Sequence, residues 1–81
     1  MGIVEDKIYD FVMDYVDAPN RAKANSLLNN AFDLREEGDL TLDEARATIN
    51  KLIDLAKPEE QAGLQEILEQ NRGKIEKYLT K

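Results

Sequence analysis

The chain has 81 residues with 17 acidic and 11 basic side chains, a net charge of −6, and neither cysteine nor histidine. This length allows a single domain, and the missing residue types exclude disulfides, thiolate chemistry and the usual zinc ligands. The acidic balance disfavours direct binding to nucleic acid, because that requires a basic surface that neutralises phosphates.

The first predicted helix covers residues 4–17, where apolar residues recur at spacings of three and four, as one face of a helix requires. Ala18-Pro19 ends it, because the residue before a proline is displaced from helical geometry. Pro19 suits the first position of a second helix, 19–37, since no N–H is needed there. Gly38 then supplies the left-handed residue that commonly ends a helix.

A third helix is predicted at 42–56. Thr41 and Glu44 have the spacing of a capping box, in which each side chain bonds a backbone N–H at the helix start. Pro58 ends this helix and begins a fourth, 58–80. We expect the fourth helix to continue through Gly73, because its apolar phase is preserved beyond that residue; the alternative is a helix that stops at Arg72 with Gly73 as its cap.

These elements predict an all-α fold, a compact four-helix bundle or orthogonal helical array with short links, in one domain spanning 1–81. No segment shows the alternation of a half-buried strand, and no internal repeat is apparent. The helix phases predict that four side chains are buried, one from each helix: Phe11, Leu28, Leu52 and Leu68.

The link between the second and third helices resembles the loop of an EF-hand. In that resemblance Asp33, Glu37, Asp39 and Glu44 would supply ligands for calcium or magnesium. Arg35, however, stands at the third loop position, where an oxygen ligand belongs. We interpret the link as a glycine helix end followed by a cap, with weak ion binding, or a degenerate EF-hand-like docking element, as the alternatives.

No catalytic constellation is found, so we expect no enzymatic activity and no cofactor. Ser26 is the one serine, and with no histidine it lacks the usual activating base. The adjacent carboxylates, such as Glu59 and Glu60, fall at predicted helix ends, where solvated acids are common. Nothing predicts the cleft that would shift their pKa values.

The first helix has a wider apolar face than one packing contact requires. Tyr9, Met13 and Val16 lie on its flank and need a second neighbour. That neighbour is either another helix of the same bundle, or a partner protein or second copy. In the latter case these three residues are the partner-binding candidates, since Tyr and Met are favoured at such contacts.

The sequence therefore favours a small acidic helical protein-binding module: an adaptor, inhibitor or accessory subunit whose partner is another protein or a second copy of itself. The alternatives are a homodimeric structural protein that uses the first helix, and a degenerate EF-hand-like ion-binding domain. No apolar run is long enough for a membrane span and no signal peptide is apparent, so we expect a cytoplasmic protein that contacts no membrane.

Overall fold

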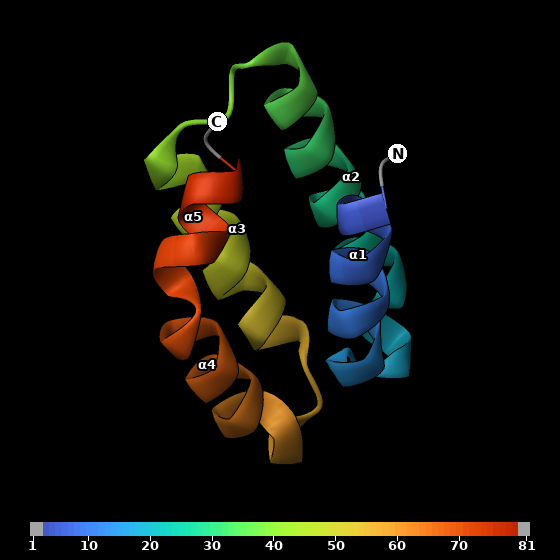
Figure 1. Cartoon of the computed structure of the whole chain (residues 1–81). Coiled ribbons are helices and arrows are strands. Elements are labelled where there is room, and N and C mark those ends of the chain that lie inside the picture. The colour runs from blue at the N-terminus through green and yellow to red at the C-terminus, as the bar shows by residue number, and fades with distance from the viewer. Residues whose placement is uncertain (1–2, 80–81) are drawn as a thin grey trace.

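The computed structural model describes residues 3–79, which form five α-helices and two short 3₁₀ turns (Figure 1). In chain order these are α1 (Ile3–Tyr15), the turn η1 (Ala18–Asn20), α2 (Arg21–Glu37), α3 (Leu42–Leu55), the turn η2 (Pro58–Glu60), α4 (Gln61–Gln70) and α5 (Arg72–Leu79). Apart from one isolated β-bridge, this part of the chain contains no β-structure. The predicted all-α class is confirmed; position 80, the expected end of the last helix, lies outside the described residues.

The segments that precede the two proline-containing turns are joined to each other through their backbones. Val16 and Ala56 form an antiparallel bridge. In it the N–H of Asp17 donates to the Leu55 carbonyl at 3.2 Å, and the N–H of Lys57 donates to the Tyr15 carbonyl at 2.9 Å. The C-terminal ends of α1 and α3 are therefore held side by side, although they are far apart in the sequence.

The order of elements recurs in the two halves of the chain, although no repeat is apparent in the sequence. Two units of helix, bridge residue, 3₁₀ turn and helix follow one another at a constant offset, since α1 and α3 end at Tyr15 and Leu55 and α2 and α4 begin at Arg21 and Gln61. The corresponding core positions are buried in both units: Val12 with Leu52, Val16 with Ala56, and Ala24 with Leu64. These pairs differ in residue type, which hides the repeat from a reading of the sequence.

The centre of the molecule is the packed pair α2 and α3; α1 rests mainly on α2, while α4 and α5 rest on α3. Leu28 and Leu52 are buried there, as predicted, whereas Leu68 of α4, also predicted to be buried, is only half-buried. The prediction for Phe11 is wrong, because its side chain is 38% exposed. It contacts the ring of Tyr15, with the ring centroids 5.1 Å apart, and faces the open side of α1.

The link between α2 and α3 has the predicted glycine end and the predicted threonine cap, but the Glu44 carboxylate bonds the Thr41 hydroxyl and not the Thr41 backbone N–H that a capping box requires. Gly38 adopts the left-handed conformation with φ 79°. Its N–H donates to the Arg35 carbonyl, and that of Asp39 to the Leu34 carbonyl, which together satisfy carbonyls at the end of α2. At the start of α3 the hydroxyl of Thr41 accepts from the backbone N–H of Glu44 at 3.1 Å and donates to its carboxylate at 3.0 Å.

The last helix is interrupted at Asn71 and not at Gly73. The Asn71 backbone departs from helical geometry, with φ −110° and ψ 9°. Its side-chain amide donates to the Ile67 carbonyl at 2.8 Å, a local bond that competes with the regular helical pattern. Gly73 lies inside α5, so the chain remains helical through it, as expected.

Candidate functional site

The three partner-binding candidates, two on α1 and Val16 directly after it, are packed within the chain. Val16 has no exposed surface, and Met13 lies against the core. Tyr9 also packs on the core, and its hydroxyl donates to the side-chain oxygen of Asn25 in α2 at 2.8 Å. Of the two neighbours that the sequence allowed for this flank, the structure supplies another helix of the same chain.

Replacing Tyr9 with alanine is therefore expected to destabilise the fold, by about 1–3 kcal/mol, through lost packing and a lost hydrogen bond. Tyr9→Phe is the matched control, because it keeps the ring and removes only the hydroxyl, at about 0.5–1.5 kcal/mol. Chemical denaturation measures both values. An alanine variant as stable as the parent would show that Tyr9 is not held by α2.

The opposite flank of α1 carries exposed apolar side chains; Ile3 at the start of the helix and Leu42 of α3 are exposed apolar residues as well. Val4 is 50% exposed and Phe11 38%, although both are apolar. Their neighbour Ile8, one turn from each along the helix, is half-buried. This stripe faces away from the contact of Tyr9 with α2, so a partner could reach it without displacing a helix.

An apolar groove with a cavity volume of about 470 Å³ lies beside this flank. Val4, Ile8 and Phe11 form one wall, and Ile67, Leu68 and Ile75 from α4 and α5 form the other. Phe32 of α2 and Leu52 of α3 contribute to the lining between them and are buried, so they form its floor. Figure 1 shows α1 and α5 apart on two sides of the molecule, as this arrangement requires.

The groove has few polar groups. Thr48, Asn71 and Tyr78 are its neutral polar residues, and Lys7 and Lys74 are its charged ones. Among residues 3–79 no carboxylate lines it, although acidic residues outnumber basic ones in the chain. Within residues 3–79, neither lysine takes part in a salt bridge.

Arg35 fixes the end of α5 at one end of the groove. Its Nε donates to the backbone carbonyl of Tyr78 at 2.8 Å, and its guanidinium lies 3.8 Å from the centroid of the Tyr78 ring. A cation over an aromatic face is an attractive contact. The contact joins α2 to α5, so the floor and one wall of the groove are held together.

A cluster of charged side chains holds the same wall against α3. Arg46 of α3 donates from Nε to the Glu76 carboxylate at 2.9 Å, and Arg72 donates to the same oxygen at 3.2 Å. The hydrogen bond from Arg46 and the charges of Arg46 and Arg72 lower the pKa of the Glu76 carboxyl below its ordinary value. Ionised Glu76 therefore stabilises the folded state relative to the unfolded state.

The lowered pKa of Glu76 predicts a pH-dependent contribution to stability. The contribution is present above the unfolded carboxyl pKa of about 4.3 and is lost as the pH falls through the lower folded value. Glu76→Gln should therefore be less stable than the parent at neutral pH, with a difference that shrinks in acid. Urea denaturation of both proteins at about pH 7 and about pH 2–3 measures it. A difference independent of pH would contradict the assignment.

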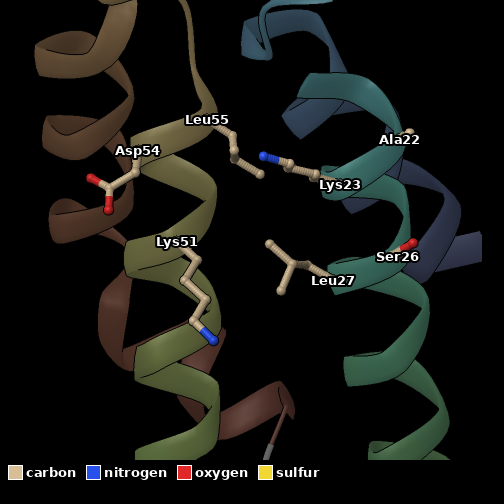
Figure 2. Close-up of a pocket in the computed structure, with 7 residues that line it drawn as sticks. All are labelled: Ala22, Lys23, Ser26, Leu27, Lys51, Asp54 and Leu55. Carbon is tan, nitrogen blue, oxygen red and sulfur yellow. The ribbon is translucent and has the colours of Figure 1, made fainter. Parts of the chain in front are cut away.

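A second, shallower depression lies between α2 and α3 (Figure 2). Lys23, Ser26 and Lys51 supply its polar groups beside the apolar side chains of Leu27 and Leu55. Figure 2 shows the Asp54 carboxylate, the Ser26 hydroxyl and the two ammonium groups pointing in different directions. Because they do not converge on one point, this surface offers no defined polar site.

The EF-hand-like stretch is divided between two helices and their link. Asp33 and Glu37 belong to α2, Asp39 lies in the link, and Glu44 belongs to α3 with its carboxylate bonded to Thr41. Within residues 3–79 no three histidine, cysteine or acidic side chains are grouped so that they could hold a metal ion. The hydrogen bonds around Thr41 agree with a helix cap.

Comparisons of the chain with protein-family models, with curated proteins and with solved structures find no match. The described helices include none that is long and apolar enough to cross a membrane.

The groove between α1 and the α4–α5 segment is the main functional candidate that the structure offers. This groove lies on the other flank of α1 from Tyr9, Met13 and Val16, the candidates taken from the sequence. Which flank stays open depends on contacts between helices that are distant in the sequence.

Proposed function

We propose that this chain is a non-catalytic protein-binding module, an adaptor, inhibitor or accessory subunit, that docks its partner in the groove between α1 and α4–α5. The observation that carries the proposal is an apolar groove lined from all five helices, with Val4 and Phe11 exposed along its edge. Clefts between the helices of a bundle are a common place for ligands.

Exposed apolar surface of this kind costs free energy in water, about 25 cal/mol for each Å². Single exposed apolar residues are ordinary, but a continuous apolar groove with an apolar edge is typical of an interaction site. A partner that fills the groove also covers Val4 and Phe11. Burial of both the groove and its edge would drive the association.

The shape of the groove favours a macromolecule over a small metabolite. Pockets for small molecules are also mostly apolar, but they bury most of the ligand's surface. Here the lining is mostly apolar, and Val4 and Phe11, which form part of one wall, remain exposed to solvent. The acidic remainder of the surface and the lack of cysteine suit a protein that works in the cytoplasm without contacting nucleic acid or a membrane.

Site-specific photo-cross-linking tests the proposal. A benzoylphenylalanine at Phe11 places the reactive group on the groove edge, and the same residue at the exposed Ser26, beside the α2–α3 depression, is the matched control. In cells that express the chain, we expect an adduct with one partner protein from position 11 and none from position 26.

The mass of the adduct also separates the functional alternatives. An adduct of two copies of this chain would contradict the proposal of a module that binds another protein and would favour the homodimer. Adducts that form only from position 26, or from neither position, would contradict docking in the groove.

A further inference from the structure

The charges at the groove identify the chemistry of its occupant, provided that the groove is the docking site proposed above. The part of the lining that the structure describes contains two lysines and no carboxylate, in a chain with 17 acidic and 11 basic residues. Random placement on this acidic surface would favour carboxylates at the groove. The local charge is therefore opposite to that of the whole chain.

The two lysines come from opposite walls. Lys7 belongs to α1 and Lys74 to α5, and both side chains are exposed. Figure 1 places these two helices on different sides of the molecule. The long apolar stem of a lysine can lie along a groove wall while its ammonium group reaches the solvent at the border. Neither ammonium is used in a salt bridge by the described residues.

We propose that the occupant is an amphipathic α-helix of a partner protein whose apolar stripe is bordered on both sides by carboxylates. The stripe would fill the groove between Ile8 and Ile75, while acidic residues on its two borders would meet Lys7 and Lys74. Amphipathic helices commonly dock in this way, through apolar residues at spacings of three and four.

A helix fits this arrangement better than a fatty acid does. A fatty acid carries a single carboxylate at one end of its chain, so it would not present charge to both walls along their length. A bound helix also leaves its polar face in water, which suits a groove open on one side. It is wide enough, at about 10–12 Å with its side chains, to cover the exposed edge at Phe11.

The test uses two synthetic amphipathic peptides with the same leucine stripe. One peptide has glutamate at every border position and the other has lysine. Binding is measured by fluorescence anisotropy to the wild-type chain and to the double variant Lys7→Glu/Lys74→Glu. The control is Lys23→Glu/Lys51→Glu, which makes the same change in net charge on the other face of the α2–α3 pair (Figure 2).

We expect the glutamate-bordered peptide to bind the wild-type chain at least about ten-fold more tightly than the lysine-bordered one, with a preference that weakens as salt is added. The preference should be lost or reversed in Lys7→Glu/Lys74→Glu and retained in the control variant. Circular dichroism confirms that each variant is folded.

Several results would overturn the inference. Equal binding of both peptides in the groove would contradict the requirement for acidic border residues, but it would not contradict docking in the groove. A preference lost equally in both double variants would assign it to net charge. If neither peptide binds but dodecanoate binds in a manner that depends on Lys7 and Lys74, the occupant is a lipid and not a helix. If neither peptide binds, the helical occupant is wrong, and the cross-link from Phe11 tests the groove independently.

Discussion

Replacing Leu64 with alanine should lower the free energy of unfolding by about 2–5 kcal/mol. Leu64 has no exposed surface and is, with Val16, one of the two largest fully buried side chains. It anchors α4 at the position that Ala24 occupies in the other half of the repeat. For a domain whose total stability is about 5–15 kcal/mol, the loss would be a large fraction. Urea denaturation followed by far-UV circular dichroism measures it.

Phe11→Ala is the informative comparison for Leu64→Ala. Phe11 is the larger side chain, but it is 38% exposed and lies on the groove edge. It should therefore lose clearly less stability than the Leu64 variant. If the two variants were equally destabilised, Phe11 would be part of the core, and the exposed edge of the groove would not exist in solution.

The second large effect is expected at Phe32. This residue is buried in α2, belongs to the core cluster and lines the groove floor. Phe32→Ala should cost about 3–5 kcal/mol, because it removes buried apolar surface and leaves a cavity beneath the groove. Thermal and urea denaturation measure the loss.

Phe32→Leu provides the control for this prediction, because it keeps an apolar side chain of much of the volume. It should retain more of the stability than Phe32→Ala does. An alanine variant with the stability of the parent would show that the groove floor is not packed as described. The groove would then have no rigid base on which to seat a partner.

Those parts of the fold that depend on neighbouring residues could be predicted from the sequence. Gly38 ends α2 and Thr41 caps α3, since both signals act within one turn of a helix. The prolines at 19 and 58 mark the two turns correctly, although each lies in a short 3₁₀ segment that precedes the α-helix. These features depend only on residues close together in the sequence and not on contacts between helices.

Features that depend on distant contacts could not be predicted in the same way. Tyr9 is covered because Asn25 and α2 lie beside it, whereas Phe11 is left at the groove edge. Both are aromatic residues on a broad apolar face, and periodicity alone does not distinguish them. The bridge between Val16 and Ala56 is equally hidden, because it joins two residues that are far apart in the sequence.

The same limit applies to the candidate site. The sequence indicated that α1 had more apolar surface than one contact needs, but it could not show which flank remained open. Lys7 and Lys74 are far apart in the chain, and only the packing of α1 and α5 around α2 and α3 brings them to one groove. A surface assembled from all five helices leaves no contiguous motif to recognise.

The six isoleucines offer the most direct measurement of the central claim, that partners dock in this groove. Four of them, Ile8, Ile49, Ile67 and Ile75, line it, whereas Ile3 and Ile53 do not. With ¹³C-labelled isoleucine methyl groups, the partner captured through Phe11 is added and the methyl spectra are compared. If the partner docks in the groove, the four groove methyls should shift strongly and the other two should change little. Shifts confined to Ile3 and Ile53, or spread evenly over all six, would contradict it.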